Sequence, residues 1–253
     1  TNTSGTSNSG LGYNALYSNT TGNANTATGM YSLVYNTTGD NNTASGYYAL
    51  TTSTTGSNNT GMGYASLYSN TEGDNNVAVG YQSLYSNTTA DHNTSIGRQT
   101  MYHNSTGTKN VAVGNNAMEQ NTTGYENTAI GYNALLSNTD GTGGVAIGFK
   151  AMYDCTGVNN TAVGYEALFD TSTGVDNTGV GYNVLKANTT GANNTAVGDS
   201  ALVANTDADG GTAVGHSALM TSSTGDFNTA IGYEALKWCT GAYNTAVGKE
   251  ALV

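Results

Sequence analysis

Small, apolar and polar residues recur at fixed positions along the whole chain. The segment 160–168, NTAVGYEAL, has near-copies at 194–202, 228–236 and 244–252. Its central glycine recurs fifteen times along the chain, and of the fourteen intervals between these glycines twelve are 17 residues and two are 16. The glycines are at positions 12, 29, 46, 63, 80, 97, 114, 131, 148, 164, 181, 198, 215, 232 and 248. A fixed period of this length is typical of a repeat array. We therefore expect a single array over residues 1–253, without separate domains.

Each repeat can be numbered from this glycine as position 0. Position −2 is always Ala, Gly or Ser, position −1 is apolar in thirteen repeats, and position +4 is Leu or Met in all fifteen. Position −3 is Thr or Val except at Ser9, and position −4 is Asn except at Gly144 and Gly211. The β-branched and aromatic residues around position 0 favour a strand. Alternation along that strand places −3, −1 and +1 on one face and the small residues on the other.

The remaining positions predict the other elements of the repeat. A second short strand is expected through the Ala-Leu-Tyr at +3 to +5, and the Asn-Thr-Thr-Gly at +7 to +10 is typical of a turn. Seventeen residues could also hold a helix, but the glycines and Asn-Thr pairs would break it. The sequence therefore predicts an all-β fold, a parallel β-solenoid (β-roll) of fifteen 17-residue coils. At strand spacing such a stack would be about 70 Å long.

In-register stacking would align identical side chains into ladders. Asn at −4 and +7 can form amide ladders, and Tyr at +1 can form an aromatic row. Each coil is expected to bury one Val and one Leu. The candidate aromatic ladder, on the surface or between chains, consists of Tyr13, Tyr47, Tyr64, Tyr81, Tyr132, Tyr165, Tyr182 and Tyr233.

Both faces of the predicted strand carry restricted residue types. A sheet with one wet face should show a freely varying polar column. Restriction on both faces suggests that one face lies inside the coil and the other packs against another chain, as in a homotrimer or lateral bundle. A single solenoid with an outward Tyr row remains the alternative.

The phase of the two chain ends predicts a contact between copies. Val253 is at position +5 and Thr1 at position +6, so the repeat would continue from one copy into the next. Such a head-to-tail contact does not close and produces filaments. A chain cut at repeat boundaries would look the same. The candidate end-to-end interface is Thr1, Asn2, Thr3, Leu252 and Val253.

Composition narrows the classes of partner. Charged residues make up only 9% of the chain and the net charge is −11, which disfavours nucleic-acid binding. No run of eighteen apolar residues exists, so no membrane insertion is expected. No signal peptide is visible and the chain opens on Thr, which fits a processed product or an excised fragment.

Reactive side chains do not form a convergent pattern. A metal site needs ligands that meet in space, whereas three histidines occupy different repeat positions: His92, His103 and His216. Carboxylates recur at position +11, where they could hold a cation or lie in solvated turns, among them Asp40, Asp74, Asp91 and Asp226. No Ser-His-Asp constellation or nucleotide-binding motif is present. We expect neither an enzyme, nor a cofactor, nor a metal site.

Cysteines and glycosylation motifs occupy position +7. Cys155 and Cys239 replace Asn in the two 16-residue repeats and would lie five coils apart, too far for a disulfide within one chain. We expect two free buried thiols; contact with a neighbouring chain stays open. Asn-x-Ser/Thr sequons occur at this position, as chance also predicts for this composition, and sparse sugar stays open: Asn19, Asn36, Asn87, Asn104, Asn121 and Asn188.

The repeat wording is similar to that of known fibrous proteins. Residues 10–22, GLGYNALYSNTTG, and the NTAVGYEAL units resemble the head repeats of YadA-like trimeric autotransporter adhesins and the repetitive shafts of phage-type tail fibres. The resemblance covers essentially all 253 residues, although adhesin head repeats are usually shorter than 17 residues. It implies a parallel β-roll, commonly trimeric, that is extracellular or on a virion surface and has an adhesive or stalk role.

These observations predict a structural subunit of an extracellular fibre that assembles by end-to-end stacking, with itself as partner. One alternative is an adhesin head or phage tail-fibre segment that binds a cell surface or glycan through Tyr and Asn. A second alternative is ice binding, because Thr recurs at −3 and around +8. That alternative needs a flat, wet Thr face, whereas the −3 Thr shares its face with Val.

Overall fold

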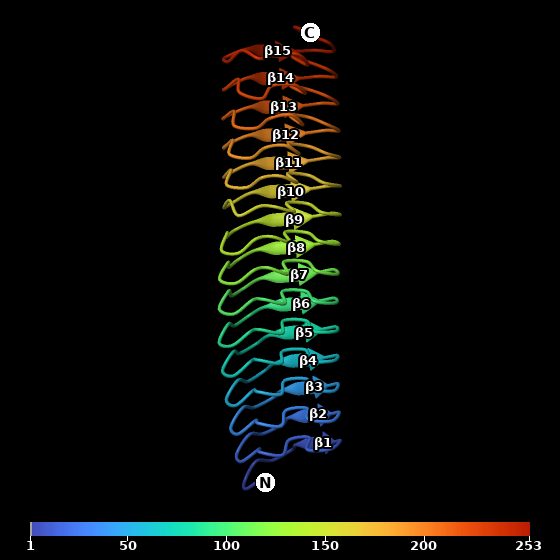
Figure 1. Ribbon diagram of the computed structural model, residues 1–253, viewed down its shortest axis with the longest axis vertical. Coiled ribbons are helices and arrows are strands. Elements are labelled where there is room, and N and C mark those ends of the chain that lie inside the picture. The colour runs from blue at the N-terminus through green and yellow to red at the C-terminus, as the bar shows by residue number, and fades with distance from the viewer. Residues whose placement is uncertain (1) are drawn as a thin grey trace. The chain divides into compact units, whose positions relative to one another are not determined.

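The computed structural model describes residues 2–253, which contain fifteen three-residue strands, one in every repeat (Figure 1). Each strand covers positions −3 to −1, directly before the repeated glycine. The predicted all-β parallel solenoid is therefore confirmed. Among the described residues, no helix has the length and hydropathy needed to cross a membrane.

The chain forms two compact units, Thr1–Asn127 and Thr128–Val253, each a stack of coils. Unit 1 contains β1 (Ser9–Leu11), β2 (Thr26–Thr28), β3 (Thr43–Ser45), β4 (Thr60–Met62), β5 (Val77–Val79), β6 (Thr94–Ile96) and β7 (Val111–Val113). Unit 2 contains β8 (Thr128–Ile130), β9 (Val145–Ile147), β10 (Thr161–Val163), β11 (Thr178–Val180), β12 (Thr195–Val197), β13 (Thr212–Val214), β14 (Thr229–Ile231) and β15 (Thr245–Val247).

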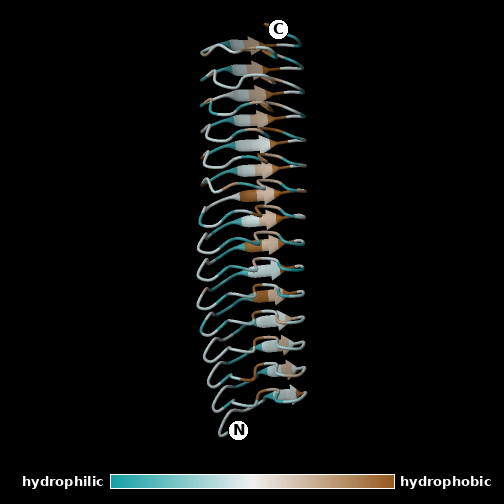
Figure 2. Ribbon diagram, viewed as in Figure 1, coloured by the Kyte–Doolittle hydropathy of each residue, from teal (hydrophilic) through white to brown (hydrophobic). Residues whose placement is uncertain are grey.

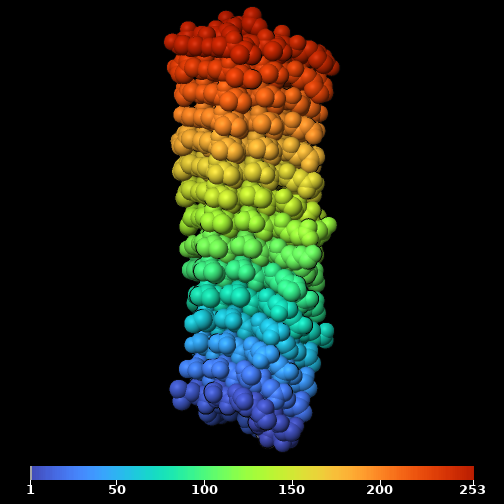
Figure 3. Space-filling model, turned by 180° about the vertical axis from the view of Figure 1, so that it is seen from behind, coloured from blue at the N-terminus to red at the C-terminus, as the bar shows by residue number. Residues whose placement is uncertain are grey.

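Within each unit every strand pairs in parallel with the next one along the chain. The register joins equivalent positions in the longer and shorter repeats alike: Thr43 pairs with Thr60 across 17 residues, and Thr229 pairs with Thr245 across 16 residues. In Figure 3 each coil of a unit forms one layer, and the side chains of successive layers line up in columns. Stacking of like on like, the basis of the predicted ladders, is thus built into the register.

The repeated glycine allows the coils to approach this closely. Gly46 has a φ of 140°, which side chains with a Cβ rarely adopt. A Cβ built on Gly46 would lie 2.5 Å from the carbonyl oxygen of Gly63 in the next coil and 2.7 Å from its carbonyl carbon. A methyl group at this position would therefore force two coils apart.

The interior is filled by the small residue at −2 and the Leu or Met at +4. Ala44 and Leu50 in the β3 coil are completely buried, and the same holds for Ala162 and Leu168 in the β10 coil. The small side chain at −2 leaves room for the Leu at +4 from the opposite wall of the coil. The resulting core is close-packed and only one side chain deep on each side.

The prediction of a second strand at +3 to +5 is wrong, because this segment is a turn with alternating backbone handedness. Tyr48 and Leu50, at +2 and +4, have φ values of 61° and 50°. The left-handed conformation at these two alternate residues directs their N–H groups to opposite neighbouring coils. Tyr48 donates to the carbonyl of Met30 in the preceding coil at 3.1 Å, and Leu50 donates to the carbonyl of Ser66 in the next coil at 3.0 Å. These bonds offset the cost of left-handed backbone, about 1–2 kcal/mol per residue.

The prediction that each coil buries a Val is also wrong. The −1 side chains lie on the outer face; Val180 is 37% exposed and Ile231 is 41% exposed. The predicted alternation itself is confirmed, with the small residue inside and −3 and −1 outside. In Figure 2 many strands change from pale or teal at their start to light brown at their end, and many of the turns are teal.

The predicted turn at +7 to +10 is confirmed and ties each coil to the next. The backbone N–H groups of Thr20, Thr21 and Gly22 all donate to the carbonyl of Thr37, at 2.9, 3.1 and 3.3 Å. The Thr20 hydroxyl donates to the same oxygen at 2.9 Å. The +8 Thr is therefore used for coil-to-coil bonding.

Candidate functional surfaces

The first candidate surface is the face that one coil presents to the next, which contains a buried amide column at +7. Asn36 Nδ2 donates to Asn19 Oδ1 at 2.7 Å and to the carbonyl of Gly39 at 3.1 Å. Both asparagines are at most 1% exposed. Equivalent side-chain bonds follow at Asn87, Asn104, Asn121 and Asn205.

A second amide column lies at −4, on the opposite side of the same interior. The backbone N–H of Asn42 donates to Asn25 Oδ1 at 2.9 Å. Asn25 Nδ2 donates to the carbonyl of Gly39, three residues before Asn42, at 2.7 Å, so this oxygen receives N–H groups from both Asn25 and Asn36. The predicted amide ladders are confirmed, and they join successive coils of the stack.

The +7 column is interrupted where Asn is replaced by a shorter polar residue. The buried hydroxyls of Ser53, Thr171 and Ser222 have no hydrogen-bond partner. The amide oxygens of Asn36 and Asn205, one coil before the two serines, are also unpaired. A hydroxyl on Cβ does not reach the neighbouring coil, whereas an amide one carbon further out does. Sequence reasoning missed these breaks, although every non-Asn residue at +7 marks one.

Cysteine occupies the same column in the two shorter repeats. Cys155 and Cys239 are both free, and only Cys155 is buried, so the prediction of two free buried thiols is confirmed for Cys155 and wrong in burial for Cys239. Cys155 Sγ accepts a bond from Asn160 Nδ2 at 3.6 Å. Burial raises the pKa of the Cys155 thiol to about 11, although its hydrogen bonds with Gly157 and Asn160 lower it. A buried thiol of this kind is a poor nucleophile.

The six predicted sequons at +7 lie inside the coil. Their asparagines are at most 1% exposed, and the Nδ2 atom that would carry a sugar donates to protein oxygens, as in Asn104. A sugar at these positions is incompatible with the described coil. Exposed asparagines directly before the −4 Asn form separate Asn-Asn-Thr sequons that sequence reasoning missed: Asn41, Asn58, Asn159 and Asn193.

The second candidate surface is the predicted aromatic column at +1. Stacked rings join Tyr47 to Tyr64 and Tyr64 to Tyr81, with centroids 5.7 and 5.1 Å apart. Tyr165 and Tyr182 stack at 5.1 Å. The row is confirmed only in segments, because non-aromatic residues interrupt it at Met30, Arg98, Asn115 and Asp199.

The other predicted members of this row have different neighbours. Tyr132 stacks on Phe149, which in turn stacks on Tyr165, at 5.5 and 5.1 Å. Tyr233 stacks on His216 at 5.2 Å. Tyr13 meets Tyr31 edge-on at 5.6 Å. Because stacked ring faces cover one another, mainly ring edges and hydroxyl groups are left for solvent.

A second aromatic column at +5 was not predicted. Tyr68, Tyr85 and Tyr102 stack with both centroid distances at 5.0 Å and interplanar angles of 4° and 9°. Tyr153 and Phe169 repeat this arrangement in unit 2 at 5.0 Å. The signal was present in the sequence, but the +5 tyrosines were assigned to a strand that does not form.

Crowding of phenols changes their acidity. The pKa of Tyr47 is raised to about 12, mainly by its hydrogen bond with Tyr48, and also by desolvation and neighbouring phenols. Burial and the flanking Tyr68 and Tyr102 raise the pKa of Tyr85. At neutral pH the Tyr47 and Tyr85 phenols are therefore uncharged.

The third candidate surface is the outer face of the sheet, formed by positions −3 and −1. All residues of these two columns are uncharged. Thr43 and Thr195 at −3 are exposed, and in the described part of the chain their hydroxyls make no hydrogen bond. Rows of threonine hydroxyls and methyls thus lie beside rows of Val and Ile, with no charge between them.

Carboxylates at +11 bond to backbone. Asp40 Oδ1 accepts from the N–H of Asn23 at 2.6 Å, and Asp91 Oδ1 accepts from the N–H of Asp74 at 2.7 Å. Asp226 accepts likewise from Asp209 at 3.0 Å. Over the described residues, no group of three or more His, Cys, Asp and Glu side chains could hold a metal ion.

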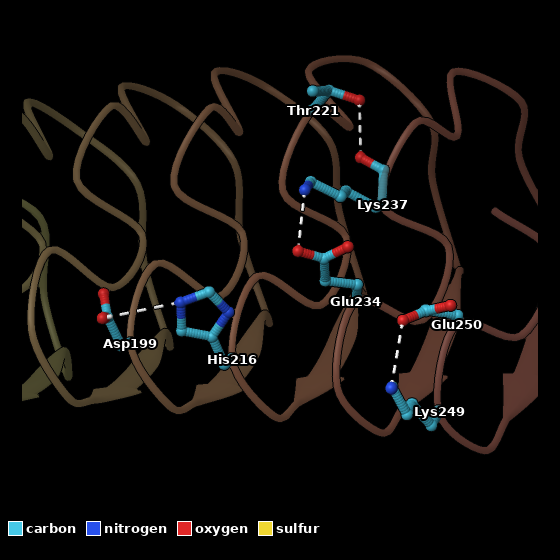
Figure 4. Close-up of polar contacts among 7 residues, drawn as sticks. All are labelled: Asp199, His216, Thr221, Glu234, Lys237, Lys249 and Glu250. Atoms are coloured by element: carbon cyan, nitrogen blue, oxygen red, sulfur yellow. Dashed lines mark hydrogen bonds and ion pairs between the residues drawn. The ribbon is translucent and has the colours of Figure 1, made fainter.

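Several charged side chains pair along the surface of unit 2 (Figure 4). His216 lies 3.8 Å from Asp199, and Lys237 pairs with Glu234 at 2.8 Å. The hydrogen bond from Lys237 lowers the pKa of Glu234. His92 and His103 lie in unit 1, where His103 meets Tyr102 edge-on at 4.8 Å, so the three histidines are not brought together.

The predicted end-to-end residues are placed as follows. Thr1 lies outside the described residues. Asn2 Nδ2 donates to the carbonyl of Gly5 at 2.7 Å, and the Thr3 hydroxyl donates to that of Thr20 at 2.9 Å. Leu252 and Val253 are 67% and 57% exposed. No pocket opens on the part of the chain that the structure describes.

No protein-family model matches the sequence, and no curated protein is similar enough to count as a relative.

Proposed function

We propose that this chain is a structural subunit of an extracellular fibre that grows by end-to-end stacking of its coils. The observation that carries the proposal is the self-complementarity of a coil. In the β4 coil, Gly63 donates to the carbonyl of Ser45 in the preceding coil, and Thr60 donates to that of Asn76 in the next, both at 2.8 Å. The same bonds recur from repeat to repeat, so any coil fits on any other.

The two sides of a coil are complementary to each other and not to themselves. A contact between copies made in this way is heterologous and adds subunits in one direction. The buried amides strengthen it, because each +7 Asn offers an oxygen to the coil after it and a nitrogen to the coil before it. An edge of unpaired backbone groups is also a strong template for pairing.

Gly248→Ala tests the stacking of copies. A Cβ on Gly248 would meet no heavy atom closer than Ala251 Cβ at 4.0 Å, whereas at equivalent glycines within a unit it would meet the next coil's carbonyl. The variant places a methyl group on the face that would receive another copy, and costs the chain only backbone strain of about 1–3 kcal/mol.

We expect Gly248→Ala to lose seeded elongation, followed by light scattering, while its own Tm falls only by the several degrees that this backbone strain accounts for. Lys249→Ala is the matched control, because this exposed side chain belongs to the same coil and points outward. Elongation of Gly248→Ala at the wild-type rate would contradict stacking through coil faces.

We extend the proposal to lateral association, as a homotrimer or bundle. Its support is the uncharged outer face, on which −1 residues such as Val197 and Ile231 stay 38% and 41% exposed. A continuous exposed apolar patch usually marks a protein–protein contact. Measurement of the mass per unit length of the fibres tests lateral association. A mass per length equal to that of a single stack of coils would contradict it.

Ice binding is a second candidate, favoured by the same outer face. In the sequence, the sharing of one face by Thr and Val spoke against ice binding. In the structure the −3 and −1 columns are both exposed, uncharged and in register, and the hydroxyls of Thr43 and Thr195 are free. Thermal hysteresis that disappears on Thr195→Lys would support this function. No hysteresis in the wild-type chain would remove it.

A further inference from the structure

The tyrosine columns combine three properties that lead beyond a fibre role. Their rings are close, nearly parallel and accessible from the side. Tyr68, Tyr85 and Tyr102 stack at 5.0 Å and are each partly exposed, and Tyr64 and Tyr81 stack at 5.1 Å with 43% and 46% exposure. The edge of a phenol ring carries both its hydroxyl group and the ring carbons next to it, so these groups face solvent.

We propose that the stacked tyrosines of unit 1 are sites of oxidative cross-linking, in which dityrosine joins adjacent coils, with Tyr68, Tyr85 and Tyr102 as the principal site. The required co-reactant is a one-electron oxidant of the peroxidase class supplied with hydrogen peroxide. Each of two phenols loses one electron and one proton, and hydrogen peroxide takes up both electrons and both protons to form two waters.

The two tyrosyl radicals then combine. One carbon–carbon bond forms between ring carbons adjacent to the hydroxyls, and the hydrogens on these carbons move to oxygen and restore both phenols. Coupling requires two radicals that meet before either is quenched. In-register stacking supplies this proximity, since each ring already contacts the equivalent ring one coil away.

The distribution of phenylalanine makes the proposal specific to unit 1. Stacked Tyr–Tyr pairs recur in unit 1, whereas in unit 2 phenylalanine occupies alternate places: Tyr132 stacks on Phe149 and Tyr153 stacks on Phe169. Phenylalanine has no phenol to oxidise. In unit 2 only Tyr165 and Tyr182 form a stacked pair of phenols among the described residues.

The cross-link would join residues 17 positions apart, as Tyr68 and Tyr85 are. A covalent bond across a loop of this length restricts the unfolded chain, as a disulfide does. Oxidation is therefore expected to raise the Tm of the chain without any change in the fold. The bond lies within one chain, so it does not depend on fibre growth.

The test is treatment of the full chain with peroxidase and hydrogen peroxide, followed by dityrosine fluorescence and by mass spectrometry of cross-linked peptides. We expect linked peptides that have lost two hydrogens and join Tyr68 to Tyr85 or Tyr85 to Tyr102. Tyr85→Phe keeps a stacking ring but removes the phenol shared by both pairs, so both products should fall at least tenfold.

Two variants in unit 2 serve as matched comparisons. Tyr153→Phe should leave the yield unchanged, because Tyr153 already faces Phe169. Phe169→Tyr should add a new cross-linked peptide that contains residue 153. Equal yield at these tyrosines in the urea-unfolded chain, or no loss on Tyr85→Phe, would overturn the proposal.

Discussion

Unit 1 and unit 2 are built from the same repeat but differ in the continuity of the buried amide column at +7. In unit 1 this column is interrupted once, at Ser53, whereas unit 2 has four interruptions, at Cys155, Thr171, Ser222 and Cys239. The backbone nevertheless stays regular: Thr171 and Ser222 still donate to the carbonyls of Leu168 and Leu219, at 3.4 and 3.3 Å.

The difference shows what each layer of bonding contributes. Glycine, small interior residues and the backbone ladder are present in both units and define the coil. The amide column adds hydrogen bonds in a dry interior, where an unpaired partner is costly. Unit 1 is therefore expected to resist unfolding more strongly than unit 2.

Removal of an intact amide should have the largest effect. Asn104→Ala eliminates bonds to Asn87 Oδ1 and to the Gly107 carbonyl, both at 3.0 Å, and takes the acceptor away from Asn121. We expect a loss of about 3 kcal/mol in the free energy of unfolding, measured with urea. Thr171→Val is the control in unit 2: its hydroxyl is already unpaired, so stability should be unchanged or slightly higher. Equal losses in the two variants would contradict the distinction between the units.

Alkaline pH should weaken unit 2 before unit 1. The pKa of the Cys155 thiol is raised from 9.0 to about 11. Below pH 9.0, the pKa of the thiol in the unfolded chain, the raised pKa stabilises the folded state. This contribution is lost as the pH rises from 9.0 to about 11, the pKa of the thiol in the folded chain. The loss amounts to about 3 kcal/mol. The Tyr47 phenol of unit 1 has its window between pH 10.0 and about 12.

Cys155→Ala should remove this sensitivity. We expect the unfolding free energy of the variant, measured with urea between about pH 8 and about pH 11, to depend less on pH than that of the wild-type chain. An unchanged slope in Cys155→Ala would assign the alkaline loss to other groups.

Repair of an interruption should stabilise unit 2. Ser222→Asn places an amide where the oxygen of Asn205 has no donor. We expect a gain of about 1–2 kcal/mol in unfolding free energy. Ser222→Ala controls for removal of the unpaired hydroxyl alone. If the Asn variant is no more stable than the Ala variant, the amide column does not stabilise the stack.

Surface ion pairs should matter least in either unit. Lys109 and Glu126 in unit 1 are about half exposed, so Lys109→Ala should cost less than about 0.5 kcal/mol. Lys186 of unit 2 pairs with the more sheltered Glu166, which raises the Lys186 pKa, and Lys186→Ala should cost up to about 1 kcal/mol. Thermal unfolding of both variants in low and high salt would check these two values. A larger loss of stability would show that the pairs do more than neutralise charge.

Periodicity was sufficient to predict the coil, its strand and its amide ladders. Asn19 and Asn36 lie one period apart in the sequence and bond side chain to side chain in the interior. Alternation correctly divided the strand residues between two faces. It could not say which face is inside, because Ala and Val both tolerate burial; the Leu at +4 fills the interior and leaves room only for the smaller residue.

The turn at +2 to +5 was mispredicted for a related reason. Tyrosine favours strands, and no propensity rule expects Leu50 in a left-handed conformation. Here the need to bond both neighbouring coils outweighs the intrinsic preference of the residue. The +5 tyrosine ladder was hidden by this error, since a strand would have sent neighbouring side chains to opposite faces.

Electron microscopy of the purified chain tests the central claim, that coils of different copies stack as coils within a chain do. The claim predicts filaments many times longer than a single chain, with an uninterrupted axial repeat of about 4.8 Å, the spacing of paired strands. Discrete particles of single-chain length at every concentration would contradict it.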